Sequence, residues 1–215
     1  MFKLNNAFVF LAISILLFRC AGSSPKINQS PRKLNYSSAD TVNGVILFSF
    51  SAPKSSWQYY YSLEILNVDT KTKTTLRGSS YEPDISNDSL KTGYEAIVLP
   101  KGNYKLYNWT ISSGQTKFFP KGNFSLPFTV FGGDVNYIGD YEGVVHSSRS
   151  RGSGHWPSTE VYYVVSNRYS QDAGVVASKF PDVDLSKVVN SMPDFGQNNS
   201  KFSLMYLKGI NIPGE

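Results

Sequence analysis

Short segments in which apolar and polar residues alternate, separated by turn residues, constrain the fold of this chain more than any other feature. In residues 59–69, for example, Tyr61, Leu63 and Ile65 alternate with more polar positions, which is the pattern of a half-buried β-strand. Strands are expected at residues 44–52, 59–69, 94–99, 104–112, 124–131, 135–145 and 160–167. In the first of these, Val45 and Leu47 are expected on one face and Ile46, Phe48 and Phe50 on the other. Many short strands with turn signals between them predict a mainly β chain, an antiparallel β-sandwich with a short C-terminal helical segment.

Turn residues predict how some of these strands are joined. Residues 100–103, Pro-Lys-Gly-Asn, favour a tight turn, so the strands at 94–99 and 104–112 are expected to pair as a hairpin. Residues 71–75 are expected to fold back on the strand before them. Gly139 lies within a strand pattern, which indicates a β-bulge or a close approach of another backbone.

Helical signals are confined to the C-terminal part of the chain. Residues 170–180 are expected to form a helix, with Ser170 as its N-cap and Pro181 ending it. Residues 184–191 are expected to form a second short helix, and residues 201–207 a last strand.

The N-terminus has the layout of a secretory signal. Lys3 precedes the apolar residues 7–18, and Cys20, which is the only cysteine of the chain, follows them. Residues 17–20, Leu-Phe-Arg-Cys, resemble a bacterial lipobox, although Arg19 stands where a small residue is usual. The resemblance implies that Cys20 carries a lipid anchor such as palmitate. The alternative is an ordinary cleaved signal in which Cys20 has no role.

This layout also predicts the domain organisation. Residues 1–19 are a signal peptide, residues 20–40 a flexible tether, and residues 41–215 a single β-sandwich domain. The apolar run is shorter than the roughly 20 residues that span a bilayer. Ala21, rather than Asp, follows the cysteine, and by the rule for bacterial lipoproteins this favours the outer membrane or cell surface, with the periplasmic face as the other possibility.

Three motifs carry a family resemblance. Residues 99–104, Leu-Pro-Lys-Gly-Asn-Tyr, resemble a hairpin of prealbumin-like (transthyretin-like) sandwich domains. Residues 126–130 and 132–139 are similar to the segment that follows in small bacterial lipoproteins of uncharacterised function. The resemblance covers about residues 44–181 and implies an extracytoplasmic lipoprotein domain. It implies no catalytic residues.

The sequence contains few residues of the types that carry catalysis or bind metal. His146 and His155 are the only histidines of the sequence. A metal site could be drawn from them with Asp140, Glu142 and Glu160, and a Ser-His-Asp triad with Ser147 and Asp140. We favour a solvated loop instead, because neither a Gly-x-Ser-x-Gly elbow nor a phosphate-binding glycine pattern accompanies them. We therefore predict no catalytic residue, metal or cofactor, and no enzyme activity.

Charge and aromatic content suggest what the partner is. The net charge is +5 with only 17% charged residues, and the basic residues are scattered, which argues against nucleic acid as a partner. In the loop at 146–159, Trp156 with Arg149 and Arg151 is a candidate surface for a partner protein or polysaccharide. Trp109 is expected in the core.

The function expected is a lipid-anchored, non-enzymatic interaction module of the cell envelope. The alternative is a carbohydrate-binding or accessory domain of an envelope enzyme or secretion assembly, which would expose coplanar aromatic rings.

Overall fold

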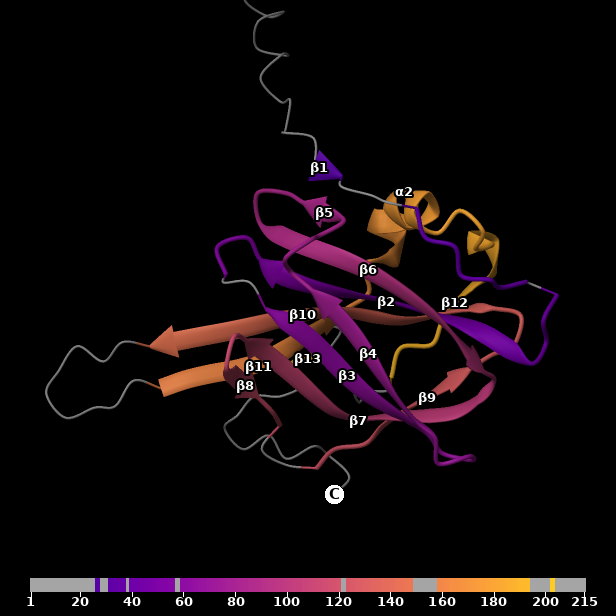
Figure 1. Cartoon of the computed structure of the whole chain (residues 1–215), viewed down its shortest axis with the longest axis horizontal. Helices are drawn as coiled ribbons and strands as arrows, with labels where there is room; N and C mark the ends of the chain where they lie inside the picture. Colours follow the sequence, from indigo (N-terminus) through magenta and orange to yellow (C-terminus); the bar gives the residue numbers. More distant parts are fainter. Residues whose placement is uncertain are drawn as a thin grey trace, which may run out of the picture.

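The computed structural model describes residues 26–27, 31–37, 39–56, 59–120, 123–148, 158–193 and 202–203. Within these residues the chain forms two β-sheets and one α-helix (Figure 1). The expectation of a mainly β chain with a short helix near the C-terminus is confirmed. No helix in this part of the chain is long and apolar enough to cross a membrane.

The first sheet is mixed. Its strands, in spatial order, are β1 (Lys26–Ile27), β5 (Ile85–Ser86), β6 (Leu90–Pro100), β2 (Asn43–Pro53), β10 (Val135–Ser148), β11 (Ser158–Ser166) and β13 (Phe202–Ser203), and β12 (Val188–Asn190) also pairs with β10. The prediction of a purely antiparallel architecture is wrong here, because β10 runs parallel to both β2 and β12. Between β2 and β10 the chain passes through the second sheet, and such a long connection allows a parallel return.

The second sheet is antiparallel throughout the described residues. Its strands are β4 (Lys73–Ser79), β3 (Tyr60–Asn67), β7 (Gly102–Ser113) and β8 (Thr116–Phe118), and β9 (Leu126–Val130) also pairs with β7. The expected return of the chain after β3 is confirmed, because β4 pairs with β3 as a hairpin. In this order β4 forms one edge of the sheet.

The turn at residues 100–103 does not make the hairpin that its sequence predicts. The strands on either side of it, β6 and β7, belong to different sheets, so the turn carries the chain from one sheet to the other. Gly102 adopts φ +151°, and the hydroxyl of Tyr104 donates a 2.8 Å hydrogen bond to the carbonyl of Pro100. The prediction failed because a turn sequence specifies a local change of direction and not the sheet in which the next strand pairs.

The core lies between the two sheets, and a second cluster lies on the opposite face of the first sheet. Alternate residues of β2 enter these two clusters, as the alternation predicted: Ile46, Phe48 and Phe50 face the second sheet, and Val45 and Leu47 face the other way. The inner cluster contains the fully buried Trp109, which confirms its expected place in the core. The outer cluster is covered by the helix α2 (Tyr169–Lys179) (Figure 1).

The C-terminal helices begin and end differently from the sequence prediction. Helix α2 is present, but its N-cap position is Arg168 rather than Ser170, and no side chain caps it. The second predicted helix is reduced to the 3₁₀ turn η1 (Leu185–Lys187), where Asp184 accepts a hydrogen bond from the backbone of Ser186. The chain then enters β12, because Val188 and the residues after it pair with β10.

Gly139 marks a β-bulge, as its place in a strand predicted. It adopts φ +116°, and the register between β10 and β2 shifts by one residue between Tyr137 and Asp140. Because of the extra residue, Tyr137 and Asp140 both lie on the face of the sheet that α2 covers, whereas Tyr141 turns into the inner core. A single glycine thus places a carboxylate beneath the helix.

Candidate binding groove

A hollow of about 530 Å³ lies between β4, the edge strand of the second sheet, and the part of β6 that β5 does not cover. Its volume falls within the range of small-ligand sites. The lining residues come from four strands and the N-terminal segment: Arg32, Phe48, Tyr60, Thr75, Leu76, Arg77, Gly78, Glu95 and Ile97.

Strand alternation builds the apolar part of the groove. On β6, Tyr94 and Ala96 point toward α2, so the intervening Glu95 and Ile97 point toward the groove. On β4, Leu76 points inward in the same way, and Phe48 of β2 closes the bottom. The floor of the groove is therefore a continuation of the inner core, in which Phe48 and Leu76 are buried and Ile97 is partly exposed.

Charged side chains form the rim of the groove. An η-nitrogen of Arg32 lies 2.6 Å from a carboxylate oxygen of Glu95, and Nζ of Lys179 lies 3.9 Å from the other oxygen. On the opposite side Arg77 is exposed, and it makes neither an ion pair nor a hydrogen bond with any residue that the structure describes. The rim thus has one satisfied acidic group and one cation that is available to a ligand.

Aromatic rings stand beside the groove. Tyr60, which lines it, is 54% exposed, and Tyr81 is 40% exposed. Their ring centroids are 4.8 Å apart with an interplanar angle of 25°, so the two rings stack on each other. They present a narrow aromatic wall rather than a broad flat platform.

The segment 31–37, within the predicted tether, contacts the domain. The backbone N–H of Arg32 donates to the carbonyl of Lys179 at 2.8 Å, and that of Leu34 donates to the carboxylate of Asp182 at 2.9 Å. Leu34 and Tyr36 also pack on the outer cluster. The segment thereby brings the Arg32 side chain to the groove.

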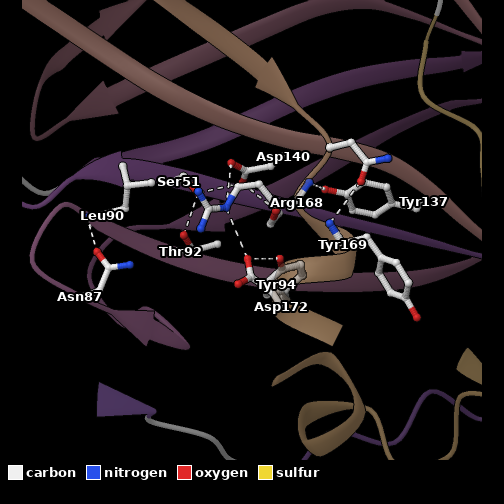
Figure 2. Close-up of polar contacts among 12 residues, drawn as sticks. Ser51, Asn87, Leu90, Thr92, Tyr94, Tyr137, Asp140, Arg168, Tyr169 and Asp172 are labelled. Carbon is white, nitrogen blue, oxygen red and sulfur yellow. Dashed lines mark hydrogen bonds and ion pairs between the residues drawn. The ribbon is translucent and has the colours of Figure 1, made fainter. Parts of the chain in front are cut away.

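On the other face of the first sheet, buried charges fasten α2 (Figure 2). The Asp140 carboxylate accepts hydrogen bonds from Ser49 at 2.6 Å and from Ser51 at 2.8 Å. Nε of Arg168 lies 4.0 Å from Asp140 and 3.4 Å from Asp172, which is in the first turn of the helix. Arg168 therefore stands between a carboxylate of the sheet and a carboxylate of the helix.

The same cluster includes a tyrosine of β6, and the pKa of its buried carboxylate Asp140 is raised. The hydroxyl of Tyr94 donates a 2.6 Å hydrogen bond to Asp172. Burial raises the pKa of Asp140 to about 6, although the two serine hydroxyls and the Arg168 charge favour its ionised form. Burial also raises the pKa of Glu142. These groups are enclosed between sheet and helix, which is an arrangement for holding the helix in place.

The site residues predicted from the sequence are only partly described. Cys20, Arg149, Arg151, Trp156 and His155 lie outside the described residues. His146 lies in β10, six residues from Asp140, which separates the two by about 20 Å in an extended strand.

The structure therefore does not bring His146 and Asp140 together as a triad or metal site. Among the described residues no group of three or more His, Cys, Asp or Glu could hold a metal ion.

No pattern in the sequence predicted the groove. Its floor residues carry ordinary core signals, and Arg77 lies in a polar strand without a motif. The one available signal was the polar composition of residues 71–77, which is typical of an edge strand.

Comparisons with known proteins give no family. No protein-family model matches this chain, and no curated protein matches it. Among solved structures it is similar to a leucine-rich repeat protein from Bacteroides thetaiotaomicron, with 19% sequence identity and a TM-score of 0.30. The match covers 46% of this chain and 14% of that chain, and a likeness this low carries no argument about fold or function.

Proposed function

We propose that this protein is an exported, lipid-anchored protein of the cell envelope that acts as a non-enzymatic interaction module, built on a transthyretin-like β-sandwich. The N-terminal layout that ends at Cys20 supports the anchor, and the strand–turn–strand motif at residues 126–139 supports the fold type. The observation that carries the binding role is the open groove, which is lined by apolar side chains and by Arg77, an exposed cation with no ion pair among the described residues.

The buried charges support binding over catalysis. Asp84, Asp140 and Asp172 are the buried acids of the described part, and each is bonded to groups that hold the fold together. A catalytic acid or base needs a cleft in which it can reach a substrate. Asp140 and Asp172 are instead enclosed between the first sheet and α2, and Asp84 is held by Lys179 and the backbone of Tyr94.

The geometry of the N-terminal segment indicates which side of the domain would face a membrane. Residues 31–37 lie against α2, so a lipid on Cys20 would be at most about 40 Å along the chain from Arg32. The α2 side of the domain would then lie closest to the bilayer. Because Ala21 rather than Asp follows Cys20, we propose that the anchor lies in an outer membrane or at the cell surface.

A carbohydrate-binding or accessory role is the second candidate. The observation that favours it is the aromatic wall of Tyr60 and Tyr81 beside the groove, because sugars stack on such rings.

Two measurements test the proposal. Cells that express the chain are fed an alkyne fatty acid, and the N-terminal peptide is analysed by mass spectrometry; acylated Cys20 is expected, and a Cys20→Ser variant should lose the label. A photo-reactive residue is then placed at Thr75 on the groove, with Thr116 on β8 as the matched exposed control. Adducts with an envelope protein at position 75 but not at position 116 support the interaction module. A polysaccharide adduct at position 75 supports the carbohydrate-binding role. An unacylated Cys20 together with no adducts contradicts the proposal.

A further inference from the structure

The edge of β4 that borders the groove has free backbone groups. Two backbone hydrogen bonds at the ends of the β3–β4 pair show which residues of β4 bond to β3. The N–H of Ser80 donates to the carbonyl of Tyr59, and the N–H of Asn67 donates to the carbonyl of Thr72. In an antiparallel pair, only alternate residues exchange hydrogen bonds with the partner strand. By this alternation and the register, Gly78, Leu76 and Thr74 bond to β3.

The residues between them face outward. The N–H and C=O groups of Lys73, Thr75 and Arg77 therefore point to the free side of β4, and no strand of the described chain pairs with them there. Such a row of unpaired donors and acceptors is a template for another extended chain. It is spaced at two-residue intervals, a repeat that a peptide backbone matches and a sugar does not.

The other strand beside the groove, β6, is closed at Tyr94. The outward N–H of Tyr94 on β6 donates to the Asp84 carboxylate at 2.6 Å, and its carbonyl accepts from Lys179. Asp84 and Lys179 also form an ion pair at 2.8 Å. At Tyr94 these two side chains occupy the position that a neighbouring strand would take, whereas the edge of β4 is open along residues 73–77.

A strand added to β4 would direct alternate side chains toward the apolar floor. Phe48, Leu76 and Ile97 form that floor, which suits an aliphatic side chain of the added strand. A polar saccharide would leave its hydroxyl groups against these apolar atoms without partners.

The charge of β4 selects the partner. Lys73 and Arg77 are exposed on the edge strand, and Lys71 precedes it. If two copies of this chain paired antiparallel through β4, centred on Thr75, Lys73 of one copy would oppose Arg77 of the other, and like charges in that position are unfavourable. An acidic segment would instead place a carboxylate near Arg77.

We propose that the groove binds an extended, acidic segment of a partner protein, which adds to β4 as an additional antiparallel or parallel strand. The inference rests on the proposed interaction role but not on lipidation of Cys20. The segment would bond to the backbone of Thr75 and Arg77, place an aliphatic side chain on the floor, and place a carboxylate at the Arg77 guanidinium.

The test uses the full chain in detergent and a fluorescein-labelled heptapeptide, Thr-Val-Glu-Val-Glu-Val-Thr, in a fluorescence anisotropy titration. One matched peptide has Lys in place of both Glu residues. Two further peptides carry N-methyl groups on alternate amides: one on the odd-numbered set of amides (the first phase) and the other on the even-numbered set (the second phase). Binding of the Glu peptide is expected to be at least about tenfold tighter than that of the Lys peptide. One phase of N-methylation should abolish binding and the other should not, because only one set of amides faces β4.

Protein variants locate the binding edge. Thr75→Pro removes an outward N–H and leaves the ladder to β3 intact, so it should fold and lose peptide binding, whereas Thr75→Ala should bind as the wild type does. Arg77→Glu should invert the preference between the Glu and Lys peptides. The methylated peptides keep the test decisive even if Thr75→Pro does not fold.

Three results would overturn the inference: no heptapeptide binding, equal binding of the Glu and Lys peptides, or equal binding of both methylated phases. Binding of oligogalacturonate in place of the peptide would also overturn it. In each case, adducts from the photo-reactive residue at position 75 would leave the interaction module standing, so that the two failures are distinguishable.

Discussion

Strands β6 and β4 face the same groove, and each has backbone N–H and C=O groups that point away from its paired strand. The two strands differ in whether these groups have partners. On β6, the outward N–H and C=O of Tyr94 are bonded by Asp84 and Lys179, and residues 31–37 lie close by. On β4, the outward groups of Thr75 and Arg77 have no partner strand in the described chain. Edge strands are a liability that proteins usually cover. By our proposal, the edge left open on β4 receives a partner strand.

The largest expected effect comes from breaking the closed edge. Lys179→Met leaves the Asp84 carboxylate buried without its cation, which should reduce the free energy of unfolding by about 3 kcal/mol in urea titrations. Lys54→Met is the matched control, because the Lys54–Asp88 pair is largely exposed at 3.6 Å and should contribute less than about 0.5 kcal/mol. Equal losses in the two variants would show that the Asp84–Lys179 pair does not close the edge.

A smaller effect is expected from the buried carboxylate on the closed side. Burial raises the pKa of Asp140 to about 6, so between about pH 4 and 6 the folded protein holds a proton that the unfolded chain releases. Asp140 therefore contributes stability that is present at low pH and is lost as the pH rises through 6. Relative to Asp140→Asn, the wild type should lose about 2 kcal/mol of unfolding free energy between pH 4 and pH 7.

The Asp140→Asn comparison also separates Asp140 from Glu142, whose pKa is raised in the same direction. The measurement is urea unfolding of both proteins at half-unit pH steps. Parallel pH profiles for the two proteins would contradict the assignment.

The smallest effect is expected at the open edge itself. Arg77→Glu and Thr75→Ala should each change the free energy of unfolding by less than about 0.5 kcal/mol, because both side chains are exposed and neither is bonded within the described residues. Thermal unfolding followed by circular dichroism measures this. A loss of more than about 1 kcal/mol would mean that the open edge supports the fold and is not reserved for a partner.

Local patterns predicted the local features of the fold. The alternation in residues 44–52 assigned the two faces of β2, and Gly139 predicted the bulge. Both depend on neighbouring residues alone. The consequence of the bulge was not predicted, because it depends on which strand pairs with β10: the shift that places Asp140 opposite Ser49 follows from the parallel register with β2.

The candidate site could not be predicted because pairing between distant strands creates it. Residues 94–99 and 104–112 have the signals of a hairpin, and only the sheet order shows that they part. The register between β3 and β7 also shifts, between Glu64 and Ile65 of β3. Because of this irregularity, Leu106 and Trp109 of β7 both face the core, although their spacing in the sequence places them on opposite faces of a regular strand. The groove arises because β4 and β6 end up as neighbours without pairing, which no sequence motif encodes.

Hydrogen exchange at individual backbone amides, followed by NMR, tests the contrast between the two edges most directly. The account predicts that the amide of Tyr94, bonded to Asp84 in a buried site, exchanges at least about a hundredfold more slowly than the amides of Thr75 and Arg77. Leu76, whose amide lies in the ladder to β3, serves as the protected reference on β4. Protection at Thr75 and Arg77 equal to that at Leu76 would contradict the account, because the edge proposed to receive a partner strand would already be closed.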